Sequence, residues 1–505
     1  YDLGPISDVL ADVEVIAHNA KFDLLWLLQK CGIHISRVFC TMTASRLLNA
    51  GTSEKNGLDV VLSRQLGVTL GEDHSTSDWG GTTLTDEQLY YAARDVVYLH
   101  LLAEKLKSEV YNAGLNDVAA LEMTLLPIVV GMESRGFAVD IPRLIEIKNE
   151  AEMRMKACEE SVRTALVTPL LNISSPIQLR GALTKAGLKL ESTNEETLRE
   201  HIDHTGVRQI LEYRGHQKLA QQASQYMAAL EEDGRVHARF NPTGTDTGRF
   251  TCSSPNLQNV ARGPLRECFI APSGRVLVVA DYSQIELRAA AAIAGEPKML
   301  EAYTRGDDLH KITAAAVLSK GGHEVSREDR QLAKAVNFGL LYGQRSRGMM
   351  DYARTTCGVN LTEEQAAQLR RRFFDTYPSL EKWHRLADRQ AGQHIAESRS
   401  VLGRRRIIPG KASQWQAFTT LVNTPVQGAC ADGMKLALLA LSEKLPEDTH
   451  LISTIHDEVI VEAPEAAAEL VLQIVRETMV TSMQALFPSV PIEVEAQICS
   501  NWGEK

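Results

Sequence analysis

Residues 275–294 read RVLVVADYSQIELRAAAAIA, and this stretch decides the fold because a short apolar run stops abruptly at a carboxylate. The aliphatic residues 276–279 are too few for a helix, so they predict a strand that is buried on both faces and ends at Asp281. Strong helix formers follow from Ile285, so we expect the chain to turn from strand to helix just after the acid. A lone aspartate at such a corner is more often a helix cap than a catalyst, so its meaning depends on the rest of the chain.

A second stretch, residues 330–343 (RQLAKAVNFGLLYG), combines helical periodicity with cations and aromatic rings. Arg330, Lys334, Phe338 and Tyr342 recur at intervals of four, a spacing that drifts by only about 40° per step, so they form one stripe. A solvated basic face is the usual explanation of such a helix, but it would not align two rings with the cations. The stripe therefore favours a nucleoside triphosphate site, with cations on the phosphates and rings on the sugar and base.

The third stretch, residues 451–462 (LISTIHDEVIVE), alternates tightly and predicts a β-hairpin with His456, Asp457 and Glu458 at its turn. Polar residues at such a turn commonly serve only to form the turn itself. If the fold brings Asp457 beside Asp281, however, their repulsion would raise a pKa unless cations neutralise both carboxylates. Two Mg²⁺ ions, which take oxygen ligands in octahedral shells, would do so.

Together the three stretches resemble motifs A, B and C of the family A DNA polymerases, the group typified by the large fragment of bacterial DNA polymerase I. The resemblance covers nearly the whole chain. It implies an α/β multidomain fold: a right-hand polymerase with an antiparallel palm sheet and a helical thumb and fingers, preceded by a partial ribonuclease H-like α/β exonuclease domain. The implied domains are 1–115 (partial 3′–5′ exonuclease-like domain), 116–235 (thumb), 236–296 (first part of the palm), 297–390 (fingers) and 391–505 (second part of the palm).

The resemblance also implies template-directed addition of dNTPs to a primer 3′-OH, with release of pyrophosphate. Asp281, Asp457 and the backbone carbonyl of Tyr282 would hold two Mg²⁺ ions, for which Mn²⁺ can substitute, and Lys334 would be a catalytic general acid to pyrophosphate. Glu458 would support this site without touching a metal. The residues implied to bind dNTP are Arg330, Lys334, Phe338, Tyr342, Glu286, Gln284 and His310. Those implied to contact DNA are Arg249, Asn256, Gln258, Asn423, Gln427 and His456.

Some of these residues carry a more specific expectation. Phe338, where other members have Tyr, resembles members that discriminate against dideoxynucleotides, and Glu286 resembles the residue that excludes the ribose 2′-OH. His310 taken alone fits a structural histidine equally well. Arg249, Asn256 and Gln258 lie in the polar loop 241–259, similar to the family's loop at the minor groove, where acceptors shared by all correct pairs can be tested without reading sequence. The run 404–406 of three arginines fits a basic turn and a phosphate contact about equally.

The N-terminal part resembles the second and third motifs of a DEDD-type 3′–5′ exonuclease, which holds two metal ions with four carboxylates. Residues 13–30 predict a strand, a turn and a helix, and a second helix follows near residue 90. The exonuclease residues implied are Asn19, Asp23, Tyr91 and Asp95. The first motif, an Asp-x-Glu, should precede Tyr1, and Asp12-Val-Glu14 lies too near Asp23 to replace it. We therefore expect a truncated or remnant domain that cannot proofread.

Composition sets wider limits. Net charge is −10, which argues mildly against nucleic acid, although an acidic total can hide a basic cleft. No secretory leader or membrane-spanning run is visible, so we expect a cytoplasmic enzyme of a bacterial or phage-infected cell, with an organellar source left open. The expected partners are primer-template DNA and dNTPs. We expect a monomer, and the short stretch 218–234 leaves no room for the thumb insertion that recruits a thioredoxin-type partner.

Two rival functions remain at this stage. One is a 3′–5′ nuclease with the C-terminal region as a DNA clamp, which the missing Asp-x-Glu disfavours. The other is a non-catalytic DNA-binding protein. A pure clamp has no need of two carboxylates or of the full stripe from Arg330 to Tyr342, so polymerisation is favoured over both.

Overall fold

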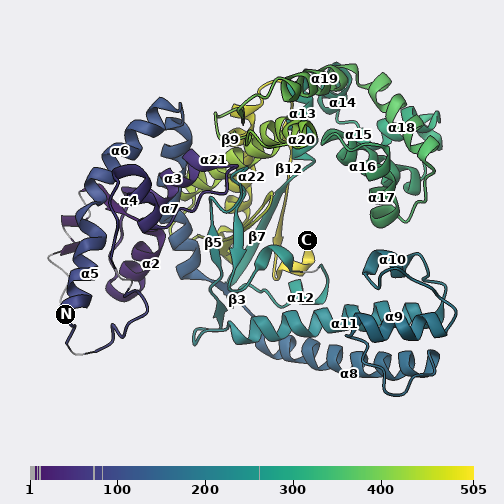
Figure 1. Cartoon of the computed structure of the whole chain (residues 1–505), viewed down its shortest axis with the longest axis horizontal. Helices are drawn as coiled ribbons and strands as arrows, with labels where there is room; N and C mark the ends of the chain where they lie inside the picture. Colours follow the sequence, from purple (N-terminus) through teal and green to yellow (C-terminus); the bar gives the residue numbers. More distant parts are fainter. Residues whose placement is uncertain (1–5, 8, 11–12, 72–73, 82, 261) are drawn as a thin grey trace. The chain divides into compact units, whose positions relative to one another are not determined.

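The computed structural model describes residues 6–7, 9–10, 13–71, 74–81, 83–260 and 262–505, with only the backbone at 355–357. The chain forms two compact units (Figure 1). The first combines Tyr1–Arg135, Phe240–Cys252 and Val278–Ile498, and the second combines Gly136–Arg239, Ser253–Leu277 and Cys499–Lys505. The fold is a mostly helical α/β structure, as predicted. The five-part division made from the sequence stays a prediction.

The N-terminal part of the first unit is a small α/β layer. Strands β1 (Val15–Ala17) and β2 (Val38–Cys40) pair in parallel, and the strand, turn and helix predicted over residues 13–30 are present. Leu24, Phe39, Leu62 and Leu102 belong to its buried core. Its helices are α2 (Ala20–Cys31), α3 (Thr41–Asn49), α4 (Leu58–Leu66), α5 (Asp86–Val97), α6 (Leu99–Asn112) and α7 (Asn116–Arg135).

A four-stranded sheet lies at the centre of the first unit, in the order β10 (His450–Ile455), β11 (Glu458–Pro464), β7 (Arg275–Tyr282), β12 (Val494–Cys499). This order is not that of the sequence, and it places β7 directly beside the predicted hairpin. Strand β7 runs through Tyr282, so it extends past the apolar run and includes Asp281. The acid therefore lies one residue before the end of the strand, close to the strand end at which the sequence placed it.

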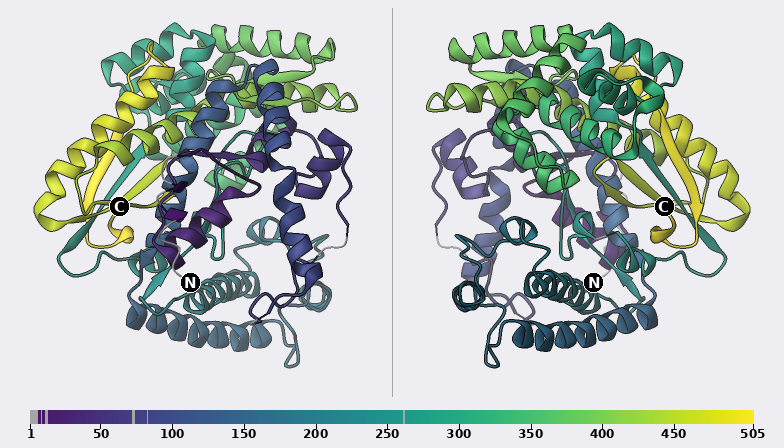
Figure 2. Two further views of the ribbon diagram at one scale, coloured as in Figure 1. Left: turned by 90° about the vertical axis from the view of Figure 1, so that its left-hand side faces the viewer. Right: turned by 90° about the vertical axis from the view of Figure 1, so that its right-hand side faces the viewer.

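The hairpin is antiparallel as predicted, with a register shift between Leu451 and Ser453. Its alternation does not separate a buried face from an exposed one, because residues 451–455 and 459–463 are all buried. Helix α7 packs against β10, and α22 (Ala468–Leu486) packs against β11 (Figure 2). Polar members such as Ser453 and Thr454 are thus enclosed with the aliphatic ones.

Most of the remaining helices of the first unit follow β7. Helix α16 begins with a capping box between Ser326 and Asp329, and its Leu332, Val336 and Leu340 are buried. The helix ends at Leu341, so Tyr342 is its C-cap. These helices are α13 (Ile285–Ala294), α14 (Pro297–Arg305), α15 (Leu309–Leu318), α16 (Arg327–Leu341), α17 (Ser346–Cys357), α18 (Glu363–Thr376), α19 (Pro378–Gly392), α20 (Gln414–Asn423) and α21 (Ala429–Lys444).

The second unit is mainly helical and has a small hydrophobic core of its own. Helices α8 (Ile141–Ala165) and α11 (Thr205–Ala228) lie side by side (Figure 1). Leu179, Leu183, Ile210 and Tyr213 are in the core that joins them to α9 (Pro176–Lys185) and α10 (Glu195–Arg199). Among the described residues, no helix is long and apolar enough to cross a membrane.

Within the arginine run at 404–406, burial decides the role of Arg404, while Arg405 and Arg406 are half-buried. Arg404 is only 2% exposed, and its Nε donates to Asp432 Oδ1 at 2.7 Å while its Nη2 donates to Glu122 Oε1 at 2.5 Å. Lys435, fully buried, also donates to Glu122. A phosphate contact by Arg404 is excluded because a buried, doubly paired guanidinium cannot reach the solvent. We call Glu122, Arg404, Asp432 and Lys435 the buried charge cluster.

Two buried histidines, His310 and His384, and the half-buried His18 make the stability of this fold depend on pH. Burial lowers the pKa of His18, His310 and His384 to about 4 in each case. The unfolded chain, with histidine pKa values near the ordinary 6.5, therefore binds more protons between pH 4 and 6.5. Stability is full above pH 6.5 and is lost as pH falls toward 4, by up to about 3 kcal/mol for each histidine.

We expect the midpoint of chemical unfolding to fall between pH 7.5 and pH 5. His384 Nε2 contacts the Leu341 carbonyl oxygen at 3.0 Å, so His384→Gln keeps a neutral donor there without a group that titrates. At pH 7.5 this variant is expected to be somewhat less stable than the parent, and at pH 5 the difference should narrow. An unchanged difference at the two pH values would contradict the titration of His384.

Candidate active site

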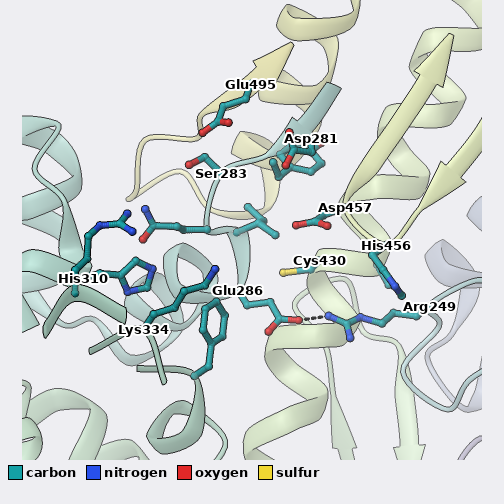
Figure 3. A pocket seen from close by; sticks show the side chains of 16 residues that line it. Arg249, Asp281, Ser283, Glu286, His310, Lys334, Cys430, His456, Asp457 and Glu495 are labelled. Atoms are coloured by element: carbon teal, nitrogen blue, oxygen red, sulfur yellow. Dashed lines mark hydrogen bonds and ion pairs between the residues drawn. The ribbon is translucent and has the colours of Figure 1, made fainter. Parts of the chain in front are cut away.

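The two predicted carboxylates meet in one cavity of the first unit, about 580 Å³ in volume. Asp281 lies near the end of β7 and Asp457 at the turn between β10 and β11 (Figure 3). The backbone N–H of Tyr282 donates to the Asp457 carbonyl oxygen at 3.1 Å, which ties the strand to the turn. Burial, with the negative charges of Asp281 and Glu286 nearby, raises the pKa of the Asp457 carboxyl to about 6.

The backbone beside each carboxylate is held in an uncommon conformation. Gln284, between β7 and α13, has φ 53° and ψ 35°, and His456 has φ 57°. Non-glycine residues in the left-handed region cost of order 1–3 kcal/mol each and cluster at functional sites. Both corners lie on the same cavity. The side chain of Tyr282 points away from it, because its hydroxyl donates to the buried Met479 carbonyl oxygen at 2.7 Å, so only its backbone is left to serve a ligand.

The opposite wall of the cavity comes from α15 and α16. Arg330, Lys334 and Phe338 of the predicted stripe line it together with His310. Asp308 caps α15 and accepts from Arg330 Nε at 2.7 Å, which orients the guanidinium. This wall is therefore a cationic surface facing two carboxylates.

His310 is both a buried histidine and a cavity residue. It is 3% exposed, and Asn337 Nδ2 donates to its Nδ1 at 2.9 Å. Since that nitrogen is an acceptor and burial holds the pKa near 4, the proton of the neutral ring is on Nε2. His310 can thus donate one hydrogen bond without carrying a charge.

Glu286 links two residues that the sequence placed in different roles. Arg249 forms an ion pair with one of its carboxylate oxygens, and the Tyr342 hydroxyl donates to the other (Figure 3 draws the first). Burial, together with the charge of Glu286, raises the pKa of the Tyr342 phenol well above its ordinary value. Tyr342, which does not line the cavity itself, is therefore linked to it through the hydrogen bond to Glu286.

The remaining predicted residues lie elsewhere. Asn423 is half-buried at the end of α20, and Gln427 is half-buried in a π-helical turn, Thr424–Gly428. Such turns occur often at functional sites. Asn256 and Gln258 belong to the second unit, where Asn256 Oδ1 accepts from the Gln258 backbone N–H at 2.9 Å. Glu458 begins β11 next to Asp457 but is not on the cavity.

Sequence reasoning missed several lining residues, namely Ser283, Ile285, Cys430, Ala431 and Glu495. Cys430 lies in the first turn of α21 and lines the cavity. Burial raises the pKa of its thiol far above the ordinary value, so the thiol stays protonated and serves as a packing group. Glu495 comes from β12, a strand with no distinguishing local pattern. Only the sheet order, which sets β12 beside β7, could have pointed to it.

The predicted exonuclease residues are spread over two helices of the N-terminal part. Asn19 precedes α2 with φ 64°, and burial raises the pKa of Asp23 in the first turn. Tyr91 and Asp95 are on α5, where the Tyr91 ring contacts the rings of His74 and Trp79. Asp12 of the rejected Asp-x-Glu lies outside the described residues.

The chemistry of the cavity fits divalent cations. Two carboxylates close enough to raise a pKa are favoured in the ionised form by a shared cation, and oxygen ligands are those that Mg²⁺ prefers. The described part of the chain has no cluster of three or more His, Cys, Asp or Glu side chains able to hold a metal alone. Asp281 and Asp457 would therefore share the ions with a backbone carbonyl, water and substrate oxygens.

The chain is similar to known proteins over most of its length. The chain matches the family of DNA polymerase family A over residues 141–504 and a 3′–5′ exonuclease family over residues 2–111. It is 35% identical to DNA polymerase I of Aquifex aeolicus, over 99% of this chain and 90% of that protein. It is 33% identical to the thermostable DNA polymerase I of Thermus thermophilus, over 85% of this chain and 52% of the relative.

Among solved structures, the chain is similar to the POL domain of Pol1 from M. smegmatis in complex with DNA primer-template and dNTP. The TM-score is 0.87 at 25% identity, over 99% of this chain and 88% of that one. The chain spans about half the length of several relatives, for example 52% of the Rhizobium leguminosarum DNA polymerase I.

Proposed function

This chain belongs to DNA polymerase family A, and from that premise we propose that it extends a primer 3′-OH with dNTPs by two-metal-ion nucleotidyl transfer, releasing pyrophosphate. It is a DNA-directed DNA polymerase. The observation that carries the proposed mechanism is the meeting of Asp281 and Asp457 in a cavity whose opposite wall bears Arg330, Lys334 and His310.

Two Mg²⁺ ions held by Asp281, Asp457 and the Tyr282 carbonyl would make the primer 3′-OH more acidic and offset charge on the leaving pyrophosphate. Arg330 and the Nε2–H of His310 hold the triphosphate from the opposite wall through charge-assisted and neutral hydrogen bonds. Lys334 Nζ donates to the leaving oxygen, where a proton must arrive. Glu458, next to Asp457 in sequence, supports the turn that carries it.

The proposed contacts with DNA are those that the family resemblance implies. Arg249, Asn423, Gln427 and His456 would meet the primer-template, as would Asn256 and Gln258 of the second unit. We also propose a cytoplasmic monomer that needs no thioredoxin-type partner.

We further propose that residues 1–115 do not proofread. Of the four metal-binding carboxylates that such a site uses, they supply Asp23 and Asp95. A labelled primer on a DNA template with Mg²⁺ tests both activities, with and without the four dNTPs. Template-dependent lengthening, with no shortening in the dNTP-free reaction, is expected. Shortening without lengthening would assign the main activity to the N-terminal part and overturn the polymerase proposal.

The cationic wall leads to a prediction about dNTP affinity. We expect Arg330→Ala to raise the KM for dNTP about tenfold to a hundredfold, because a charge-assisted hydrogen bond to phosphate contributes about 1.5–3 kcal/mol. Lys334→Ala should lower kcat as well, since Lys334 acts on the leaving group. Steady-state incorporation of a single dNTP measures both. Arg385→Ala removes an exposed arginine of α19 that pairs with Glu381, and should change neither constant.

A second prediction concerns the choice of sugar. If Glu286 excludes the ribose 2′-OH by crowding it, Glu286→Ala should reduce discrimination against rNTPs by at least about tenfold. Glu286→Gln keeps the size but weakens the pairing with Arg249, so it should retain most of the discrimination. The ratio of kcat/KM for dNTP to kcat/KM for rNTP, measured for the parent and for both variants, gives the discrimination. Equal losses in both variants would mean that the charge of Glu286, and not its bulk, sets the preference.

A further inference from the structure

The exonuclease-like part contacts the loop of residues 240–250, which leads to Arg249 on the cavity and which we call the Arg249 loop. We propose that Arg46 of α3 is a positioning residue for polymerisation, because it holds the Arg249 loop and thereby the ion pair between Arg249 and Glu286. This inference rests on the proposed function. It also gives residues 1–115 a role that does not require proofreading.

The direct contacts come from α3 and the turn that follows it. Arg46 Nη1 donates to Asn241 Oδ1 at 3.0 Å and to Thr243 Oγ1 at 3.3 Å. The backbone N–H of Gly51 donates to Asp246 Oδ1 at 3.0 Å. Arg46, Asn49 and Thr52 line a polar cavity of about 150 Å³ whose other wall is formed by residues 243–246. Two points of the loop are therefore attached to the exonuclease-like part.

The approach at Gly51 is too close for another residue. Gly51 has φ +91°, and a Cβ there would collide with the backbone carbonyl of Ile407 in strand β9 (Arg405–Ile407). The Ile407 N–H donates to the Ala50 carbonyl oxygen at 2.7 Å. The backbone of the turn that follows α3 is thus packed directly on strand β9. This contact holds the end of α3, the helix that carries Arg46, in place.

The other side of the Arg249 loop is held by contacts with Glu133 and with the buried charge cluster. Glu133 accepts from the Phe240 N–H at 2.5 Å and from Lys21 Nζ at 2.6 Å, and Lys435 Nζ donates to the Pro242 carbonyl oxygen at 2.8 Å. At Gly248 a Cβ would collide with the Arg404 guanidinium of the buried charge cluster. With its far side fixed, the loop responds to the loss of Arg46 mainly in the exposed segment 243–246.

That segment leads directly to the site. Thr245 Oγ1 donates to the Arg249 carbonyl oxygen at 3.2 Å and lies 3.2 Å from Thr247 Oγ1. Arg249 then reaches Glu286 on the cavity floor. The path from Arg46 to the cavity is continuous: Arg46, Thr243, the turn at 244–246, Arg249, Glu286. Misplacement of a substrate-positioning group by about 1 Å can cost up to about a hundredfold in rate.

A double-mutant cycle on primer extension tests this proposal in the full chain. We expect Arg46→Ala to lower kcat/KM for the correct dNTP about tenfold, and to lower it less than about twofold when Arg249 is already alanine. Lys107→Ala is the matched control, because it removes an exposed ion pair with Glu14 in the same part of the chain without touching the Arg249 loop. It should have no effect on kcat/KM.

Asp246→Ala provides an independent variant in case Arg46→Ala does not fold. Asp246 is exposed, and its loss breaks the contact with Gly51 and the ion pair with Arg406. The same non-additivity with Arg249→Ala is expected. Equal losses in both backgrounds, or no loss in either, would overturn the positioning role. A parent protein that does not extend a primer would instead overturn the proposed function, before the cycle is begun.

Discussion

Asp281→Asn and Asp457→Asn are each expected to reduce primer extension by at least about 10³-fold, equivalent to about 4 kcal/mol of activation free energy. The two side chains are the carboxylates on which the proposed cations depend, and asparagine is nearly the same size but carries no charge. Rapid-quench incorporation of one nucleotide on a labelled primer-template measures the loss. A gel-shift titration on the same duplex should show that binding is retained.

The stability of Asp457→Asn separates catalysis from folding. Burial and the nearby acids raise the pKa of Asp457 to about 6, so the ionised form at neutral pH is disfavoured by the fold. Asparagine removes that repulsion, and the unfolding midpoint without metal should stay level or rise. Loss of activity with a raised midpoint is the signature of a catalytic group. A midpoint that falls together with activity and DNA binding would show that Asp457 is structural.

Arg404→Met is expected to lower the free energy of unfolding by about 3–5 kcal/mol, the usual cost of breaking a buried ion pair from one side. Arg404 serves two carboxylates at once, and its removal leaves Asp432 with the hydrogen bond from the Ser400 hydroxyl, at 2.7 Å, but without its guanidinium partner. Arg404→Lys should recover little, because one ammonium cannot reproduce the fork that reaches Asp432 and Glu122. Urea unfolding, followed by tryptophan fluorescence, measures these differences.

A double variant that also changes Asp432, one of the two carboxylates paired with Arg404, provides the matched test. In Arg404→Met/Asp432→Asn the carboxylate left behind is neutralised, so the double variant should be more stable than the sum of the single losses predicts. Lys435→Met should cost less than Arg404→Met, because burial lowers the pKa of Lys435 to about 8 and its charge is already partly disfavoured. Additive losses in the double variant would mean that Arg404 acts through packing alone.

The local elements were predictable because their causes are local. The change from aliphatic residues to helix formers around Asp281 predicted β7 and α13, and the interval of four predicted the common face of Arg330, Lys334 and Phe338. Helix and strand periods depend on neighbours within a few residues, which the sequence displays directly. Tyr342, the last member of the predicted stripe, is the C-cap of α16.

The sequence by itself determined the secondary structure around the motifs, the family resemblance and the acids and cations of the site. Only the tertiary structure decided how these groups are paired. The sheet order set β7 beside the hairpin, and the packing of helices and loops joined Glu286 to both Arg249 and Tyr342 and enclosed Arg404 with Glu122 and Asp432. These partners are far apart in the chain, so no local pattern records them. Their pairing is decided by which buried charges can neutralise one another once the helices and strands have packed.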